Sequence, residues 1–235
     1  MRQKRKSSMK KILFLAFSAI LCLQSQAQIV SSRSSMTTTE VINQPEQPKN
    51  GWSTFNFEYL PSTFSPDKGD SQSFTGLALT WLTASNITPS LPLYLETGLG
   101  VQYSFYSESE DSKYGNSEEK FNMISLKMPI NLIFNYQIPN TAINIDPYIG
   151  IRLRGNILGE ATIENSYGDK SYNVFDKDDM GGSEYTWNRF QIGWQIGLKA
   201  RFNSLIVGLG YGSDFSEIAK KVKINETQIS LGVVF

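Results

Sequence analysis

The sequence of 235 residues contains no histidine and a single cysteine, Cys22. Histidine is the side chain that most often transfers protons in catalysis, because its unperturbed pKa lies near neutrality. A serine nucleophile would need another base, and the sequence has no evident Ser–Lys or Cys–His arrangement. These absences predict a protein that is not an enzyme.

Long apolar runs are also lacking after residue 23. The one such run, Ile12 to Leu23, follows a basic segment and precedes Ser25-Gln26-Ala27. This three-part pattern is typical of a secretory signal peptide, residues 1–27, cleaved before Gln28. The run is shorter than the roughly 20 residues of a spanning helix. Exported chains can form disulfides, but removal of this segment leaves no cysteine.

A lipoprotein is the alternative reading of the N-terminus, because an acylated cysteine such as Cys22 can end a signal peptide. Leu21 argues against it, since it stands where lipobox sequences have a small residue.

Excess positive charge is missing from the exported part. The first 27 residues hold six of the 22 basic residues and no acidic one, so residues 28–235 have 16 basic and 22 acidic residues, a formal charge of −6. Nucleic-acid binding requires a basic footprint. The composition therefore predicts no nucleic-acid partner.

What the sequence does contain is strict alternation of apolar and polar residues. Residues 28–50 are rich in Ser, Thr, Gln and Pro and predict a flexible leader. Residues 51–235 then show period-two segments, which predict β-strands. The clearest is a hairpin over 121–154, with Pro139 and Asn140 in its turn. Each arm exceeds the about 9–11 residues of a membrane-crossing strand.

Eight strands are predicted, over about 53–60, 74–84, 93–106, the two arms of 121–154, 187–202, 205–215 and 222–235. The connections alternate in length: 61–73, 107–120 and 159–186 are long, whereas 85–92 and 203–204 are short. Outer-membrane barrels have long extracellular loops and short periplasmic turns. The sequence thus predicts an all-β, eight-stranded, antiparallel, up-and-down transmembrane β-barrel with both termini in the periplasm.

A soluble eight-stranded barrel such as a lipocalin is the competing architecture, but its apolar residues point inward. Here one face of every strand is strongly apolar and the other is polar and rich in glycine. We therefore expect apolar residues to face lipid and polar residues to face the lumen.

The predicted inner face carries eleven charged residues that form the expected polar network of the lumen. Charges in so narrow an interior need partners, so a salt-bridged filling is the first interpretation and a narrow charged conduit the second. A wide pore takes about 16–18 strands. The residues are Glu58, Glu96, Lys127, Asp146, Arg152, Arg154, Arg189, Lys199, Arg201, Asp214 and Glu226.

The C-terminus alternates to its last residue and ends on an aromatic side chain. It resembles the terminal strand that the barrel-assembly machinery of outer membranes recognises. The predicted assembly signal consists of Ile229, Leu231, Val233 and Phe235.

Acidic residues gather in the long connections, at Glu108, Glu110 and Asp111 and at Asp176, Asp178, Asp179 and Glu184. Oxygen-rich clusters can bind calcium, but this spacing does not match an EF-hand loop. We predict solvated loops, no metal site and no cofactor.

The segments LKMPINLIF, INIDPYIGIRLRG, GLGVQY and ISLGVVF resemble the porin-like family of small outer-membrane β-barrels, which includes PorT-like proteins and is related in architecture to OmpX and the OmpA membrane domain. The resemblance covers residues 51–235 and implies an outer-membrane location with assembly by the barrel machinery. It implies no catalytic residues.

Together these patterns predict a monomeric scaffold in the bacterial outer membrane that contacts lipid and lipopolysaccharide and presents acidic loops to surface or secretion partners. The alternative is a narrow porin-like pore or a component of a secretion apparatus. Pro129 and Pro147 each remove a ladder hydrogen bond, so we expect β-bulges or bends there.

Overall fold

The computed structural model describes residues 50–66, 71–112, 115–165, 168–182 and 186–235, all within one compact unit, Pro48–Phe235. The predicted signal peptide and nearly all of the predicted leader lie outside these residues. The described part contains ten strands: β1 (Gly51–Pro66), β2 (Gln72–Asn86), β3 (Leu93–Ser112), β4 (Gly115–Phe134), β5 (Tyr136–Gln137), β6 (Ile143–Asn165), β7 (Gly168–Asn173), β8 (Phe190–Phe202), β9 (Leu205–Asp214) and β10 (Val222–Val234).

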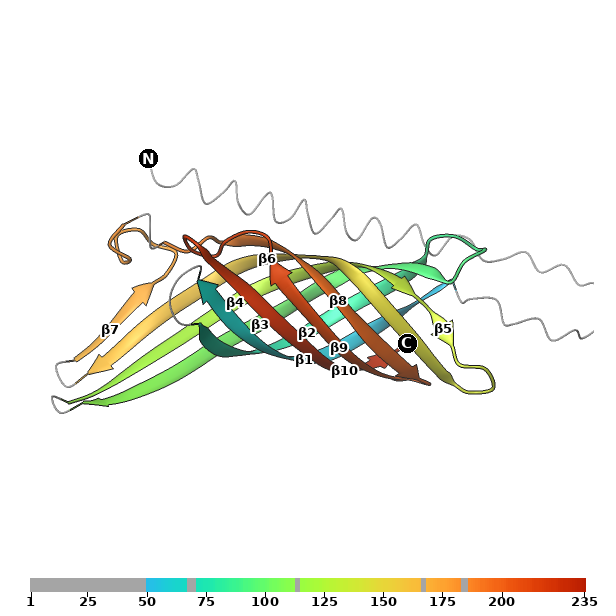
Figure 1. Ribbon diagram of the computed structural model, residues 1–235, viewed down its shortest axis with the longest axis horizontal. Helices are drawn as coiled ribbons and strands as arrows, with labels where there is room; N and C mark the ends of the chain where they lie inside the picture. Colours follow the sequence, from blue (N-terminus) through green and yellow to red (C-terminus); the bar gives the residue numbers. More distant parts are fainter. Residues whose placement is uncertain (1–49, 67–70, 113–114, 166–167, 183–185) are drawn as a thin grey trace, which may run out of the picture. The chain divides into compact units, whose positions relative to one another are not determined.

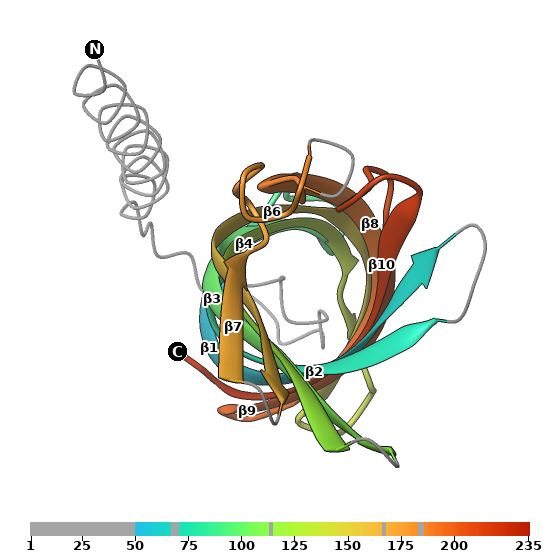
Figure 2. The ribbon, with the colours of Figure 1, turned by 90° about the vertical axis from the view of Figure 1, so that its left-hand side faces the viewer.

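Eight of these strands form a closed antiparallel ring (Figures 1 and 2). In chain order, β1 pairs with β2, β2 with β3 and β3 with β4. In the same way β6 pairs with β8, β8 with β9 and β9 with β10, and β10 pairs back to β1. Pairing of β4 with β6 completes the ring. The short β5 continues the line of β4 along β6, and β7 adds a strand to the far part of β6. The predicted eight-stranded up-and-down barrel is confirmed.

The two ends of the ring differ. One end, here called the turn end, carries the connections 87–92, 138–142 and 203–204. Asn203 has φ 51° in the predicted two-residue turn, a backbone conformation that asparagine tolerates better than most residues. The first and last described residues also lie here, because Ser53 and Phe235 exchange two backbone hydrogen bonds of 3.0 Å. The opposite end is called the hairpin end.

The strands continue well into the segments that the sequence predicted to be loops. The β1 strand runs to Pro66, and β3 and β4 pair as far as Ser112 and Gly115. The β6 strand reaches Asn165 and forms a hairpin with β7. The loop prediction was wrong for much of 61–73, 107–120 and 159–173. These stretches lack an apolar face, so hydrophobic periodicity does not reveal them, whereas backbone pairing needs no particular side chain.

Of the bulges or bends expected at the two prolines, bulges are absent, but the pairing is interrupted beside both. Pairing of β3 with β4 passes from Thr97↔Ile130 to Gly100↔Lys127 without a change of register. The two residues of β4 between these pairs, Met128 and Pro129, have no paired residue on β3. On the side of β6 that faces β4 and β5, Pro147 likewise has no paired residue, because the pairing passes from Ile133↔Tyr148 to Tyr136↔Ile145.

The register shift between β4 and β6 lies elsewhere, at Ile124 and Ser125. Ile124 pairs with Leu158 and Ser125 with Asn156, so Ile157 is the extra residue of a β-bulge.

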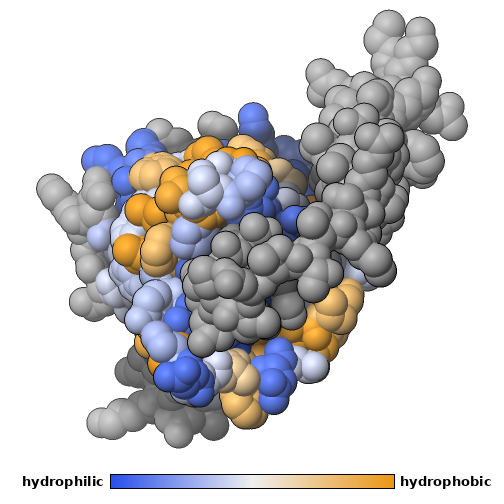
Figure 3. Space-filling model, turned by 90° about the vertical axis from the view of Figure 1, so that its right-hand side faces the viewer, coloured by the Kyte–Doolittle hydropathy of each residue, from blue (hydrophilic) through white to orange (hydrophobic). Residues whose placement is uncertain are grey.

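Along the strands, apolar side chains point outward and polar ones inward. Phe57, Leu79 and Leu209 are about half exposed, whereas Glu58, Thr80 and Gln102 are buried. Seen from the turn end, hydrophobic residues gather on the sides of the barrel wall (Figure 3). The predicted orientation is confirmed. No helix among the described residues is long and apolar enough to cross a membrane.

The polarity pattern reverses towards the hairpin end of β1, β2 and β10. Outward residues beyond Tyr59, Leu77 and Ile229 are polar or proline, for example Thr63 and Thr75. Several inward residues of this region are apolar instead: Leu60, Phe64, Phe74 and Ile224 are all buried. This reversal is typical of a sheet that leaves lipid and surrounds an ordinary hydrophobic core.

Candidate functional site: the charged interior

The interior of the ring holds ten of the eleven charged residues predicted there. Five are basic and five acidic, and every one takes part in an ion pair. Inward-facing positions of seven strands bring them together: β1, β3, β4, β6, β8, β9 and β10. They are Glu58, Glu96, Lys127, Asp146, Arg152, Arg154, Lys199, Arg201, Asp214 and Glu226.

Two lysine–glutamate pairs cross the lumen. Lys127 Nζ on β4 lies 2.6 Å from Glu58 Oε2 on β1, and Lys199 Nζ on β8 lies 2.5 Å from Glu96 Oε1 on β3. Neither pair joins neighbouring strands. Neutral residues complete each site: Thr80 donates a 2.8 Å hydrogen bond to Glu58. Alternation along single strands could predict inward charges but not these pairs.

Arg152 connects a second group of charges nearer the hairpin end. Its Nη1 lies 2.6 Å from Glu226 Oε1, and its Nη2 lies 2.9 Å from Asp214 Oδ1. Gln102 donates a 3.0 Å hydrogen bond to the other Glu226 oxygen, Oε2. Arg154 lies beside this group, with Nη2 3.6 Å from Asp214 Oδ1 and 3.6 Å from Glu226 Oε2. The group contains two positive and two negative side chains.

The third group lies at the turn end. Arg201 contacts Asp146 through two nitrogens, at 2.5 and 3.2 Å, and Asn135 donates to the same carboxylate at 2.6 Å. The guanidinium carbon of Arg201 lies 3.6 Å from the ring centre of Trp52, a cation–π geometry. Trp52 belongs to a buried cluster with Ala84, Tyr94, Ile133 and Tyr148.

Arg189 was predicted to face the lumen, and that prediction was wrong. The β8 strand begins one residue later, at Phe190, so strand alternation does not orient Arg189. Its exposed side chain donates a 2.8 Å hydrogen bond to the carbonyl of the bulge residue Ile157. Its guanidinium carbon also lies 4.4 Å from the ring centre of Phe175.

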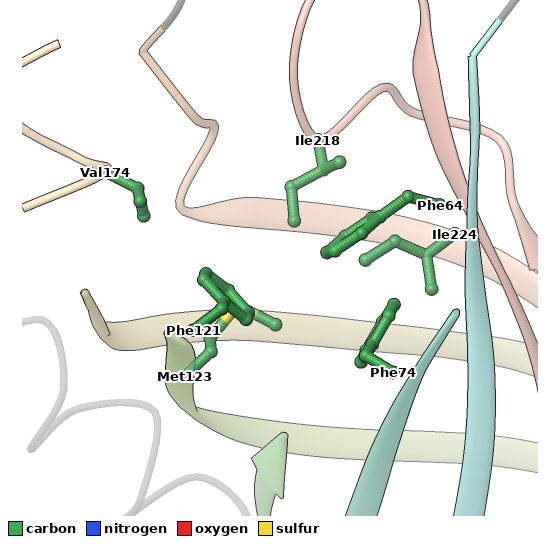
Figure 4. Close-up of a cluster of buried hydrophobic side chains, with 7 residues drawn as sticks. All are labelled: Phe64, Phe74, Phe121, Met123, Val174, Ile218 and Ile224. Carbon is green, nitrogen blue, oxygen red and sulfur yellow. The ribbon is translucent and has the colours of Figure 1, made fainter. Parts of the chain in front are cut away.

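A second hydrophobic cluster fills the hairpin end and was not predicted (Figure 4). Four strands and two connections contribute to this end cluster, and Trp187 packs against it with ring centres 5.1 Å from Phe64 and 4.9 Å from Phe121. Alternation could have identified Phe74, Phe121, Met123 and Ile224, which lie at inward positions of predicted strands, whereas Phe64 lies in a segment that was predicted to be a loop. The end cluster consists of Phe64, Phe74, Phe121, Met123, Val174, Ile218 and Ile224.

Between the two clusters large side chains occupy the interior, among them Tyr148, Arg152 and Lys199. A cavity of about 10 Å³ is lined by Lys127, Tyr148 and Lys199, among others, close to the minimum that one water molecule requires. Tyr148 occupies the space left by two glycines: a Cβ atom on Gly197 or Gly210 would lie 2.5 or 2.3 Å from its hydroxyl oxygen. Small residues opposite a large one are typical of narrow barrels.

The acidic residues of the connections are used locally. Asp176 accepts a 2.9 Å hydrogen bond from the backbone of Asp178, and Asp179 accepts one of 3.0 Å from Asn173. Glu108 accepts one of 2.8 Å from Gln72. Among the described residues no three acidic, histidine or cysteine side chains are grouped to hold a metal ion. Glu184 and the side chains of Glu110 and Asp111 lie outside the description.

One ion-paired group stands on the outer part of the β3–β4–β6 hairpins. Lys120 Nζ lies 3.1 Å from Glu118 and 2.8 Å from Glu164. Hydrogen bonds from Ser107 and then Lys120 lower the pKa of the Glu118 carboxyl. The stabilisation it provides is present above the carboxyl's unfolded-state pKa and is lost as the pH falls through the folded value. Because these side chains are exposed, the effect is small.

The four residues of the predicted assembly signal all point outward on β10 or just beyond it. Ile229, Leu231, Val233 and Phe235 are between 46% and 65% exposed. The Phe235 ring packs edge-on against Trp81, with ring centres 5.9 Å apart.

No protein-family model and no curated protein matches the sequence. Several solved structures are similar to it. Ail, the attachment invasion locus protein of Yersinia pestis, is 13% identical, with 79% of this chain and 99% of that chain covered and a TM-score of 0.42. Neisserial surface protein A is 16% identical, with 77% and 95% covered and a TM-score of 0.39. The outer membrane enzyme PagL is 14% identical, with 76% and 98% covered and a TM-score of 0.40.

Identity and TM-score are low in all three comparisons, so the fold assignment depends on this chain's own pairing and exposure. A closed ring without free edges, with apolar side chains outside and charges inside, satisfies its backbone hydrogen bonds within lipid. The chain is a transmembrane β-barrel.

Proposed function

We propose that this protein is an integral outer-membrane barrel with a closed lumen, which acts as a scaffold for surface interactions and not as a pore. The observation that carries the proposal is the end cluster over the charged interior. It adds an apolar layer to ion pairs that already cross the lumen at two heights. Ions would have to pass both layers.

Charge balance supports the same function. A conducting lumen needs charged groups that ions can contact, whereas the interior charges here bond to one another. Glu58, Glu96 and Asp146 each accept a further hydrogen bond from a neutral side chain. A buried ion with its hydrogen bonds satisfied is stable where it is, and an unpaired one costs several kcal/mol.

Conductance of purified protein in planar bilayers tests the closed lumen. Wild-type protein should show no steady unitary openings. A variant with Phe64→Ala, Phe121→Ala and Arg152→Ala together should show more frequent openings, because it loses both barriers. Steady openings of the wild type would favour the alternative, a narrow pore or part of a transport apparatus.

Surface interaction is proposed because the barrel continues beyond its apolar belt. The reversal of polarity after Tyr59, Leu77 and Ile229 supports a position in water for the outer parts of the strands and for the hairpins β3–β4 and β6–β7. With the turn end in the periplasm, these hairpins would extend from the cell surface towards partner proteins or the sugars of lipopolysaccharide.

Single cysteines test this placement, since Cys22 is the sequence's one cysteine and lies in the predicted signal peptide. Thr63→Cys should react with a membrane-impermeant maleimide on intact cells, and Leu79→Cys should be protected by lipid. The two positions point outward from adjacent strands. Equal labelling of both would contradict the proposed boundary.

The proposal includes four further points from the sequence: no catalytic activity, a monomeric state, no nucleic-acid partner, and assembly through the barrel machinery by way of the C-terminal residues. The lack of histidine supports the first. A crosslinking pull-down from intact cells would identify surface partners, and capture of a secretion complex would favour the alternative function.

A further inference from the structure

Four buried side-chain atoms in the described interior have no hydrogen-bond partner, and all belong to one small region. They are the two terminal nitrogens of Arg154, Oε1 of Gln102 and Oδ2 of Asp214. Arg154 is only 1% exposed. Buried polar atoms are nearly always hydrogen-bonded, so each exception needs an explanation.

Arg154 lies beside the carboxylates of both Asp214 and Glu226, and Gln102 contacts the second of these. Arg154 Nη2 lies 3.6 Å from Glu226 Oε2, and Gln102 Nε2 donates to that same oxygen at 3.0 Å. Arg154 Nη2 also lies 3.6 Å from Asp214 Oδ1. These contacts place Arg154, Gln102 and Asp214 in one connected group of side chains.

The orientation of the Gln102 amide is determined by its neighbours. Nε2 donates both to Glu226 and, at 3.1 Å, to the Ser104 hydroxyl. The reversed amide would direct a carbonyl oxygen at a carboxylate, which is repulsive. Oε1 of Gln102 is therefore an acceptor that is left without a donor.

The ligand that fits must be neutral and must both accept and donate hydrogen bonds. Charge is already balanced, because Arg152 and Arg154 face Asp214 and Glu226. The unsatisfied atoms comprise donors on Arg154 and acceptors on two other residues. Water can accept from the first and donate to the second, and buried waters typically make about three such bonds.

We propose that Arg154, Gln102 and Asp214 line a binding site for water trapped inside the barrel. Towards the hairpin end, the layer of Asn156, Gln191 and Ser125 and then the end cluster separate this site from bulk water. Towards the turn end, Lys127 and Glu58 cross the lumen. Exchange of this water should therefore be slow.

A crystal structure of the wild type grown with bromide in place of chloride tests the ligand's chemistry. We expect ordered water within hydrogen-bond distance of Arg154 and of Gln102 Oε1 or Asp214 Oδ2, without a bromide anomalous signal. Bromide on Arg154 would overturn a neutral ligand. Direct hydrogen bonds from Arg154 to Asp214 or Glu226, with no water between, would overturn the site.

Oxygen-17 magnetic relaxation dispersion tests the trapping in detergent-solubilised protein. The amplitude from slowly exchanging water should fall in Arg154→Met and in Gln102→Leu. Gln102→Leu changes no charge, so it tests the site even if Arg154→Met fails to fold. Asn56→Leu is the matched control, since this buried amide lies outside the site and its walls and donates within the protein to Thr54 and Thr80. An unchanged amplitude in folded Gln102→Leu, or an equal fall in the control, would contradict the proposal.

Discussion

Lys127 and Glu58 form an ion pair of 2.6 Å between β4 and β1, two strands that do not touch in the sheet. The bond therefore spans the lumen and connects opposite walls of the ring. Both side chains are at most 3% exposed, so neither charge can be solvated if the other is removed.

Removing one partner of this pair should destabilise the barrel strongly. Glu58→Gln or Lys127→Met should each lower the free energy of unfolding by about 3–5 kcal/mol, because each leaves an uncompensated buried charge. The double variant should lose much less than the sum. Urea unfolding in lipid vesicles measures all three.

The control for that experiment is Glu118→Gln, which breaks an exposed ion pair with Lys120. Exposed pairs contribute about 0–1 kcal/mol, so this variant should unfold almost as the wild type does. If Glu58→Gln and Lys127→Met lower the free energy of unfolding no more than this control does, the lumen charges must be hydrated.

Truncation of Phe121 should loosen the hairpin end. Phe121→Ala removes a ring that is 1% exposed and contacts Phe64, Tyr106 and Trp187. Truncations of buried aromatic residues cost about 3–5 kcal/mol. In a background where Trp187 is the only tryptophan, its fluorescence should shift to the red as water reaches it.

Phe57→Ala serves as the comparison, because Phe57 points outward and is 49% exposed. The Trp187 spectrum should not change in this variant. A Trp187 spectrum that is insensitive to Phe121→Ala would refute the described packing of the end cluster.

Gly197 should tolerate no side chain. A Cβ atom there would lie 2.5 Å from the backbone oxygen of Leu209 and 2.5 Å from the ring of Tyr148, so Gly197→Ala must displace a strand or a buried ring. Gly155→Ala is the matched control, since a Cβ there meets no atom within 4 Å. The temperature at which the folded band disappears on unheated gels should fall only for Gly197→Ala.

Deletion of Phe235 should reduce the amount of folded protein in the outer membrane. The residue ends the outward row of β10, and its backbone exchanges two hydrogen bonds with Ser53 across the closing seam of the ring. Phe235→Tyr retains both the aromatic ring and the backbone and should assemble normally. Wild-type surface levels of the deletion variant would remove the case for a terminal assembly signal.

Much of the barrel could be predicted from the sequence because alternation reports burial one strand at a time. Leu79 against Thr80, or Leu231 against Ser230, reveals which face meets lipid without knowledge of any neighbour. The same reasoning failed for Arg189, which precedes its strand, and for Phe64 and Phe121, whose apolar side chains point inward where the strand has left the apolar belt.

By itself, then, the sequence determined the eight strands of the ring and the direction of the side chains within them, because these depend on local composition and period. Only the tertiary structure decided which charges meet, as Lys127 meets Glu58 and Arg152 meets Glu226. It also decided that the hairpin end is filled by an apolar cluster. Such contacts depend on ring closure and strand tilt, which bring together residues that no period along the chain relates.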